Sequence, residues 1–418
     1  MVVGAGPAGV SAANAASRLG ARVTLFEKSE KFPIEKCLWP LTLCRDTSPE
    51  GLGTSHRIES EVDARFGEGV SAVDTTKKSV AVGSRTTVFD SLVVSTGSSV
   101  VQDSFPFQRK AGLFRMQDLA SFQRLAEVLG DLGRVVVSGS TALALATGDA
   151  LRQKGIEVTL VHPAGVLASS LGTTARAFLE RKLEMGGLKV VRSPIDSVVG
   201  VRRVEAIVAS GSVQAADALI SFPAWGPNPP TIEVRKGSAG GILIDSRMRC
   251  SVMGIFGAGD CAEISYRSGS LQMMYRSSAE LMGELAGRNA AGSSAEARLS
   301  GASVHAFYGT GVCTAGITLA DARGYGLDAA ETSTGSEEVS EGPEGELLCT
   351  LVFERQTGLV LGMQIVGTRA PSYGELSATI VSNRLRIVDL AFQDNPLFAL
   401  EPSDISPISA AAREGLDK

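Results

Sequence analysis

The sequence predicts an α/β protein with two doubly wound nucleotide-binding domains, followed by a C-terminal α+β domain. The chain opens with a strand, a glycine turn and a helix, and the same order of elements begins again about 135 residues later. Such strand–helix–strand units build parallel sheets with helices on both faces. A length of 418 residues also suits two or three domains.

Composition narrows the classes of function. Apolar residues make up 44% and charged residues 20%, as in a soluble globular protein. A net charge of −5 argues against a nucleic-acid partner. No apolar run approaches the ~20 residues of a membrane span. Six dispersed cysteines and no secretory leader predict a cytoplasmic protein, and three histidines without a Cys-x-x-Cys pair predict no metal site.

The opening segment, MVVGAGPAG, joins an apolar strand to a glycine turn, and an Ala-rich helix follows. In this Rossmann-like pattern Gly4 allows a tight turn, Gly6 lets the backbone approach a pyrophosphate, and Gly9 lets helix and strand pack closely. A second strand, residues 21–27, ends in Glu27, where a carboxylate meets a ribose hydroxyl. The segment therefore predicts a bound dinucleotide.

Only three residues precede Gly4, so the first strand is short for a buried parallel strand. Either residues are missing upstream of Met1, or the start of the sequence was assigned too late. The sequence does not decide between these two explanations.

The rest of the chain divides in order. The sequence predicts short strands in 66–100, a second strand–turn–helix–strand from Arg134, strands in 203–222, a loop at 224–230, two short strands ending in Gly257-Ala258-Gly259-Asp260, and a helix at 279–291.

Residues 301–418 predict the α+β domain. Two alternating runs flank Gln356-Thr357-Gly358 and predict a hairpin, and two helical patterns follow it. The acidic segment 331–346 is expected to be a mobile loop without chemistry.

These motifs resemble a known family. GAGPAG…FE, the STG at 95–97, IFGAGDCAE and the C-terminal mixed domain are similar to the FAD-dependent pyridine nucleotide–disulfide oxidoreductases over essentially the whole chain. Cys37, in EKCLWP, resembles the Cys-x-x-Pro segment of the single-cysteine branch. That branch contains coenzyme A disulfide reductases, NADH oxidases and persulfide reductases.

The resemblance implies a domain arrangement and a homodimer. Residues 1–105 and 233–300 would form the FAD domain, 106–232 a domain of the NAD(P)-binding type, and 301–418 the dimerisation domain.

The resemblance also implies an FAD site. The glycines of the opening turn would wrap the pyrophosphate, and Glu27 would hold the adenosine ribose. Asp260 would bind the ribityl chain. The full implied set is Gly4, Gly6, Pro7, Ala8, Gly9, Glu27, Lys28, Val70, Thr96, Gly97, Gly259, Asp260 and Ala262.

Cys37 would be the redox thiol, which forms or resolves a mixed disulfide or persulfide with a small thiol. Such a thiol needs a lowered pKa, and Lys28, Lys31, Lys36 and Arg45 lie near it in the sequence. The alternative is an inert, buried cysteine.

A Cys37–Cys44 pair is the other alternative. The two are seven residues apart, whereas two-cysteine reductases use Cys-x4-Cys, and a disulfide needs Cα atoms within ~7 Å. Those reductases also use a C-terminal histidine, and no histidine follows His305. The other cysteines fit buried apolar positions: Cys250, Cys261, Cys313 and Cys349.

The second glycine motif, residues 139–144, departs from the family pattern. Thr141 replaces the middle glycine, Ala146 replaces an acid, and His162 stands where an acid would select NAD. NAD(P)H binding is therefore expected to be weak or unusual, or lost. A C-terminal tyrosine of the branch is also missing, since Leu397 and Phe398 stand nearest its position.

Three functions follow. The first is a flavoprotein reductase that moves a hydride from NAD(P)H to a disulfide, persulfide, sulfur or oxygen. The second is an FAD-carrying electron-transfer subunit with a vestigial nicotinamide site and a redox partner protein. The third is a flavoprotein of structural function without turnover. A small-molecule substrate, no nucleic acid and no membrane are expected.

Overall fold

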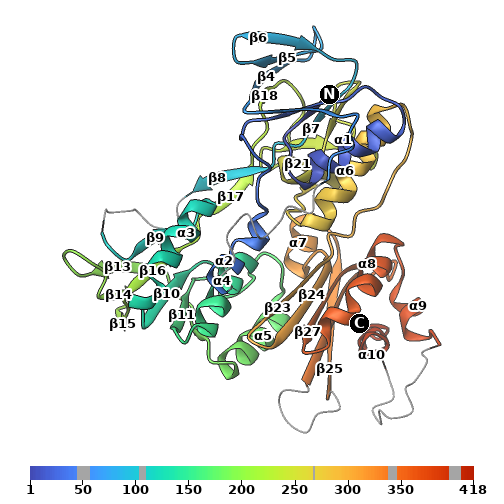
Figure 1. Ribbon diagram of the computed structural model, residues 1–418. Coiled ribbons are helices and arrows are strands. Elements are labelled where there is room, and N and C mark those ends of the chain that lie inside the picture. Colours follow the sequence, from blue (N-terminus) through green and yellow to red (C-terminus); the bar gives the residue numbers. More distant parts are fainter. Residues whose placement is uncertain (45–56, 103–109, 267–268, 338–345, 395–405) are drawn as a thin grey trace. The chain divides into compact units, whose positions relative to one another are not determined.

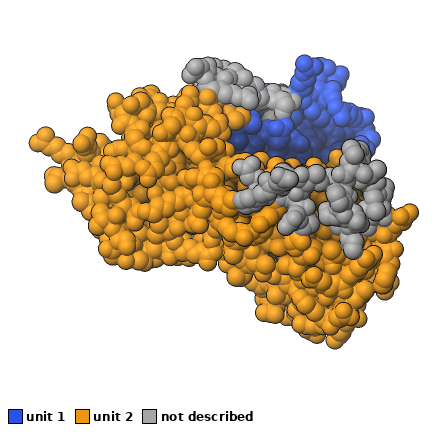
Figure 2. Space-filling model, turned by 90° about the horizontal axis from the view of Figure 1, so that it is seen from below, with its two compact units in different colours: residues 1–38, 47–102, 224–299 blue, residues 39–46, 103–223, 300–418 orange. Residues whose placement is uncertain are grey.

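The computed structural model describes residues 1–44, 57–102, 110–266, 269–337, 346–394 and 406–418. The chain divides into two compact units, coloured separately in Figure 2. Unit 1 comprises residues 1–38, 47–102 and 224–299, and unit 2 comprises 39–46, 103–223 and 300–418. The predicted domain boundaries at 105, 232 and 300 remain predictions.

Unit 1 is built on a five-stranded parallel sheet of the predicted type (Figure 1). Its spatial order is β20 (Ile255–Gly257), β7 (Leu92–Val94), β1 (Val2–Val3), β2 (Thr24–Glu27) and β3 (Asp63–Phe66). The first strand is as short as expected, and it is central, because β1 pairs with both β2 and β7. The carboxyl ends of these strands therefore meet at one edge of the sheet, which is where α/β folds bind ligands.

Helices α1 (Pro7–Arg18) and α6 (Arg276–Ala290) lie side by side in unit 1 (Figure 1). A Cβ added at Gly283 or Gly287 of α6 would lie 2.1 Å from the backbone oxygen of Ala8 or Ala12. The two helix backbones can approach this closely because both positions of α6 lack a side chain.

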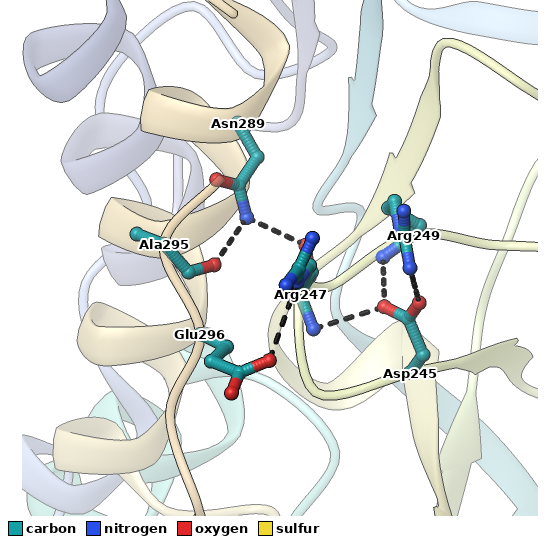
Figure 3. A network of polar contacts seen from close by, with 6 residues as sticks. All are labelled: Asp245, Arg247, Arg249, Asn289, Ala295 and Glu296. Atoms are coloured by element: carbon teal, nitrogen blue, oxygen red, sulfur yellow. Dashed lines mark hydrogen bonds and ion pairs between the residues drawn. The ribbon is translucent and has the colours of Figure 1, made fainter. Parts of the chain in front are cut away.

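The end of α6 is held by a polar network (Figure 3). The Asn289 amide donates to the carbonyls of Arg247 and Ala295, each at 2.8 Å. Arg247 also pairs with Glu296. Asn289 thus joins the end of the helix to the turn that follows strand β19 (Ile242–Ile244).

Three smaller sheets complete unit 1. They are β18–β4–β5–β6 (Thr231–Ile232, Val70–Asp74, Ser79–Val82, Arg85–Val88), β8–β17 (Ser98–Gln102, Ala224–Pro227), and β19–β21–β22 (Ile242–Ile244, Ala262–Tyr266, Gly269–Leu271). The expected loop at 224–230 is wrong for its first four residues, because β17 pairs antiparallel with β8.

Unit 2 contains the second parallel sheet. Its order is β12 (Lys189–Val191), β11 (Glu157–Val161), β10 (Arg134–Ser138), β16 (Ala218–Ser221) and β9 (Leu113–Arg115). The associated helices and antiparallel strands are α2 (Leu41–Cys44), α3 (Leu119–Glu127), α4 (Ala142–Gln153), α5 (Thr173–Met185), and β13–β14–β15 (Ile195–Val199, Ala206–Ala209, Ser212–Ala215). The strand–turn–helix–strand predicted from Arg134 is β10–α4–β11.

The C-terminal part of unit 2 is an antiparallel sheet with helices, as predicted for an α+β domain. The strands lie in the order β23 (Ser303–Phe307), β24 (Thr310–Gly316), β27 (Val360–Gly367), β26 (Glu346–Glu354) and β25 (Ala329–Glu337). The helices are α7 (Leu319–Gly324), α8 (Gly374–Ser382), α9 (Ile387–Ala391) and α10 (Pro407–Gly415). None of the helices among the described residues has the length and hydropathy of a membrane span.

One expectation for this domain is wrong. Residues 331–337 are not a loop, because β25 pairs along its full length with β26 and buries Thr332. Every residue of the apolar strand β27 is buried. The exposed apolar side chains of this domain include Leu376, Val388 and Phe392.

We expect Gly287→Ala to destabilise the protein, although alanine ordinarily favours a helix interior. The added methyl would meet the Ala12 oxygen, and overpacking of this kind costs about 1–3 kcal/mol. Thermal unfolding measures the effect. Gly324→Ala in α7 is the matched control, because its added Cβ meets no atom within 4 Å. Equal melting temperatures for the two variants would contradict the packing argument.

Candidate functional site

The predicted pyrophosphate turn lies at the carboxyl end of β1. Gly4 has a φ of +98°, and a Cβ on it would lie 2.4 Å from the Ser95 oxygen. A Cβ on Gly9 would lie 1.7 Å from the Gly4 oxygen. Both positions therefore require glycine, as the spacing of the motif predicts.

The start of α1 is open. Its N-cap residue, Gly6, makes no side-chain cap, and a Cβ on Gly6 would meet no atom within 4 Å. Pro7 occupies the first turn, where its missing N–H costs little. The main-chain N–H groups of Ala8 and Gly9 follow, in the turn whose donors have no partner within the helix. This arrangement suits an anion.

A pocket of about 330 Å³ lies beside this turn. Its lining comprises Val3, Gly4, Phe26, Glu27, Lys28, Gly69, Val70, Ser71, Thr96, Asn228, Pro229 and Pro230. Five of the predicted cofactor residues are among them: Gly4, Glu27, Lys28, Val70 and Thr96. The buried Glu27 carboxylate is fixed in place, since it accepts hydrogen bonds from the Ala5 N–H at 2.8 Å and the Ser29 N–H at 2.9 Å. Its remaining lone pairs suit ribose hydroxyls.

Sequence reasoning missed one side of this pocket. Thr96 Oγ1 donates to the Asn228 carbonyl at 2.7 Å, and the Asn228 N–H donates to the Gly97 carbonyl at 3.0 Å. Pro229 and Pro230 continue the wall. The proline-rich segment at 224–230 was visible in the sequence, but its pairing with a turn 132 residues earlier was not.

Gly259 and Asp260 lie near the start of α1. Gly259 has a φ of +72°, and a Cβ on it would lie 3.0 Å from that of Ala8. Asp260 follows in a short 3₁₀ turn, and the buried Ala262 opens β21. The structure thus brings together the two glycine motifs that the sequence separates by about 250 residues.

The Asp260 carboxylate forms a polar cluster. Ser98 Oγ donates to it at 2.7 Å, and Lys36 Nζ lies 3.4 Å from the same oxygen and also contacts Ser98. The ammonium of Lys36 lies 4.0 Å from the centre of the Trp225 ring. Burial lowers the pKa of Lys36, and Asp260 opposes that effect. Neither Ser98 nor Trp225 was predicted.

These features fit FAD. The uncapped helix end matches a pyrophosphate, the fixed carboxylate of Glu27 matches a ribose, and Asp260 with Ser98 offers hydrogen-bonding groups for a polyhydroxyl chain.

Cys37 lies in the 3₁₀ turn Lys36–Leu38, next to Lys36, and is exposed. Its Sγ donates to Glu35 Oε2 over 3.7 Å. Arg276 Nη1 at the start of α6 lies 3.0 Å from the same oxygen. The thiol thus belongs to a cluster formed by its own turn and by α6.

The expected thiolate environment is wrong. Although the residue is exposed, the protein packed around its sulfur raises the pKa of Cys37 by desolvation, the charge and hydrogen bond of Glu35 raise it further, and Arg276 lowers it less. Lys36 points to Asp260, and Arg45 lies outside the described residues. Proximity in sequence therefore misled the prediction, because the carboxylate two residues away outweighs the lysines.

The other cysteines differ from Cys37. Cys37 forms no disulfide, so no bond joins it to Cys44, which ends helix α2. Three of the remaining four are buried as expected, and Cys250 is half-buried. Leu397 and Phe398 stand nearest the position of the C-terminal tyrosine that is missing from this chain. Both lie outside the described residues.

The second glycine turn differs from the first. Thr141 is the N-cap of α4, and its hydroxyl accepts from the Ala144 N–H at 3.3 Å. A threonine side chain thus takes the place of an anion at this helix end. His162 follows β11 and accepts from the Ala164 N–H, and burial lowers its pKa, so it supplies no charge at neutral pH.

Comparison with known proteins assigns the chain to a family. Residues 1–283 match the family model described as pyridine nucleotide-disulphide oxidoreductase, and the chain belongs to this family. The chain is 25% identical over 382 residues to an NADH oxidase of Streptococcus pyogenes serotype M6, with 83% of each chain covered. It is 30% identical over 206 residues to the assimilatory nitrate reductase electron transfer subunit of Bacillus subtilis, covering 47% of this chain and 26% of that one.

The fold is also that of a solved relative. The NAD-dependent persulfide reductase from A. fulgidus superposes with a TM-score of 0.86 at 21% identity, covering 100% of this chain and 82% of that one. Family membership supports FAD and NAD(P)H as cofactors and a flavin-dependent NAD(P)H oxidoreductase as the class of enzyme.

We expect Glu27→Gln to weaken FAD binding about 10–100-fold, because a hydrogen bond to a charged group contributes about 1.5–3 kcal/mol. The flavin retained on dialysis, read from visible absorbance, measures the change. Glu68→Gln is the control, since Glu68 pairs with Arg85. Unchanged flavin retention in the Glu27 variant would contradict a role for this carboxylate at the ribose.

We expect Thr141→Gly to strengthen NADH binding, lowering Kd about 10-fold, which corresponds to ~1.4 kcal/mol. Glycine frees the Ala144 N–H, and glycine at an N-cap costs only a few tenths of a kcal/mol. Titration calorimetry on the FAD-loaded protein measures Kd. Thr318→Gly makes the same change at the N-cap of α7 and should leave Kd unchanged. A Thr141 variant with the parental Kd would show that the hydroxyl does not compete with the nucleotide.

Proposed function

We propose that this chain is an FAD-dependent oxidoreductase that passes electrons from NAD(P)H to a small disulfide, persulfide or oxygen acceptor, with Cys37 as the redox thiol. One observation carries the proposal: the ion pair between Lys36 and Asp260 ties the Cys37 turn to the carboxylate expected at the ribityl chain. An exposed thiol adjacent in sequence to that contact suits exchange with a small sulfur substrate.

Bound FAD would supply a two-electron carrier between the nicotinamide nucleotide and the acceptor. The chain's own residues have distinct tasks in this proposal. Gly4, Gly6 and Gly9 hold the pyrophosphate at the start of α1, Glu27 holds the adenosine ribose, and Asp260 orients the ribityl chain. The further residues of the implied set, Pro7, Ala8, Lys28, Val70, Thr96, Gly97, Gly259 and Ala262, shape the walls of this site.

A sulfur acceptor is favoured by the thiol cluster. Cys37, Glu35 and Arg276 place an exposed sulfur beside one cation and one buried anion, which suits recognition of a polar thiol compound. The persulfide reductase from A. fulgidus supports this class through shared fold, and the S. pyogenes NADH oxidase supports oxygen as the other acceptor.

We expect Cys37→Ser to keep its flavin and its reduction by NADH but to lose at least ~100-fold in turnover with a disulfide or persulfide, since serine cannot form the mixed disulfide. Anaerobic NADH titration followed by steady-state assays with coenzyme A disulfide measures both. Cys250→Ser is the control at a half-buried thiol. Full disulfide turnover without Cys37 would remove the thiol from the mechanism.

An electron-transfer subunit is the second candidate, and the capped start of α4 favours it. The B. subtilis relative, an electron transfer subunit, supports it over about half of this chain. Flavin that bleaches with dithionite but not with NADH or NADPH would select this function. Flavin bleached rapidly by a nicotinamide nucleotide would select the reductase.

The proposed assembly is a homodimer formed by the C-terminal domain in the cytoplasm. Leu376 on α8 and Val388 and Phe392 at α9 support such an interface, because all three are exposed and apolar and the last two lie one helical turn apart.

A further inference from the structure

The buried Glu35 carboxylate lies against the Cys37 thiol. Its side chain is only 5% exposed, and its Oε2 accepts the hydrogen bond from Cys37 Sγ at 3.7 Å. The thiol is exposed, so a substrate can reach the sulfur while the carboxylate stays shielded from water. This is the geometry of a nucleophile with an adjacent base.

Two charged groups face the thiol among the described residues. Glu35 comes from the same turn, and Arg276 comes from the start of α6. Arg276 also pairs with Glu280 on its other side, at 2.9 Å. The adjacent Lys36 is engaged by Asp260. The guanidinium therefore stabilises the ionised form of Glu35 and holds Oε2 toward the sulfur.

The thiol needs a proton acceptor. The thiolate is the nucleophile in disulfide exchange, yet partial desolvation of the sulfur and the charge of Glu35 raise the pKa of Cys37, so the thiol stays protonated at neutral pH. None of the described groups that act on this sulfur is a histidine. Among the described groups, Glu35 alone offers an acceptor oxygen to this sulfur.

We propose that Glu35 is a catalytic residue that takes the proton of Cys37 during attack and returns it to the leaving group. This inference rests on the proposed function of Cys37. As the Cys37 sulfur forms a bond to one sulfur of a disulfide RSSR′, the S–S bond breaks, the thiol proton moves to Glu35 Oε2, and R′S⁻ leaves. Glu35 then protonates R′S⁻, so Cys37-SH and RSSR′ become Cys37-S-SR and R′SH without external reductant.

The exchange half-reaction tests this step without the nicotinamide nucleotide. The probe is 4,4′-dithiodipyridine, an uncharged disulfide whose released thione absorbs light, mixed with the FAD-loaded full chain in a stopped-flow instrument. Subtracting the trace of Cys37→Ser leaves the Cys37 reaction. We expect Glu35→Gln to slow the Cys37 reaction at least ~100-fold at neutral pH, which is the low end of general base catalysis. Above the pKa of the thiol, the rate of the variant should match that of the parent. Glu35→Asp should restore part of the rate.

The sign of the effect separates a base from a neighbouring charge. If Glu35 acts only through its charge, Glu35→Gln lowers the pKa of Cys37, increases the thiolate fraction and accelerates the exchange at neutral pH. An accelerated or unchanged rate therefore overturns the proposal. Glu284→Gln is the matched control and should leave the rate unchanged, because Glu284 lies about two turns beyond Arg276 along α6 and pairs with Arg288.

The parental protein provides a second measurement in case Glu35→Gln does not fold. With a base, the Cys37 rate reaches a plateau between the pKa of the carboxylate and that of the thiol. Without one, the rate rises ~10-fold per pH unit up to the pKa of the thiol, and that profile overturns the proposal. If Cys37→Ser reacts as fast as the parent, the proposed function fails together with the inference. A Cys37-dependent rate without the plateau refutes only the role of Glu35.

Discussion

The close approach of backbone to backbone at the carboxyl end of β1 is the constraint on which unit 1 depends. Gly9 meets the Gly4 oxygen and Gly283 meets the Ala8 oxygen at separations that leave no room for a Cβ, and a Cβ on Gly259 would be tight against the Ala8 side chain. Packing of this kind resists small changes, because a protein interior is nearly close-packed. Glycines therefore act in two ways at the start of α1: Gly6 leaves the helix end open to an anion, and Gly283 and Gly259 bring α6 and the Asp260 turn against α1.

The thiol cluster follows from that packing. Arg276 is the first residue of α6, so the contact between α1 and α6 determines where its guanidinium lies. From there it reaches Glu35, whose carboxylate contacts Cys37. On the other side of Cys37, Lys36 reaches Asp260, whose position depends on Gly259. Two ion pairs thus flank the thiol, one to α6 and one to the Asp260 turn.

Sequence patterns correctly predicted the structural features that depend on neighbouring residues. The glycine spacing, the strand that ends in Glu27, the second strand–turn–helix–strand and the hairpin around Gln356-Thr357-Gly358 depend on residues close in sequence, and all have their expected form. Pairing between distant segments was not visible. The expected loops at 224–230 and 331–346 contain strands, because β8 and β26 offer partners that no local propensity reveals.

The electrostatics of Cys37 show the same limit. Counting charges along the sequence favoured a thiolate, because three lysines precede Cys37 within ten residues and Arg45 follows it. In the fold Lys36 turns away to Asp260, while Arg276, about 240 residues later, arrives beside Glu35. Whether a neighbour in sequence acts on a thiol depends on the direction of its side chain, which the surrounding packing decides. The redox role of Cys37 came from the family resemblance, and the neighbouring residue types predicted the wrong sign for its pKa shift.

The two glycine turns both join a strand to a helix, but the hydrogen bonding at the two helix starts differs. At the start of α1, Gly6 makes no side-chain cap and leaves the first-turn donors open to a ligand, whereas at the start of α4 the Thr141 hydroxyl accepts from Ala144. A capped helix end gains stability without a ligand, since a capping hydroxyl contributes about 1 kcal/mol. A nucleotide that binds at the start of α4 has to displace the Thr141 hydroxyl, or it binds without the hydrogen bond from the Ala144 N–H. A side chain that caps a helix start thus stabilises the fold but weakens nucleotide binding there. The chain has such a cap at α4, in Thr141, and none at α1, where Gly6 is the N-cap.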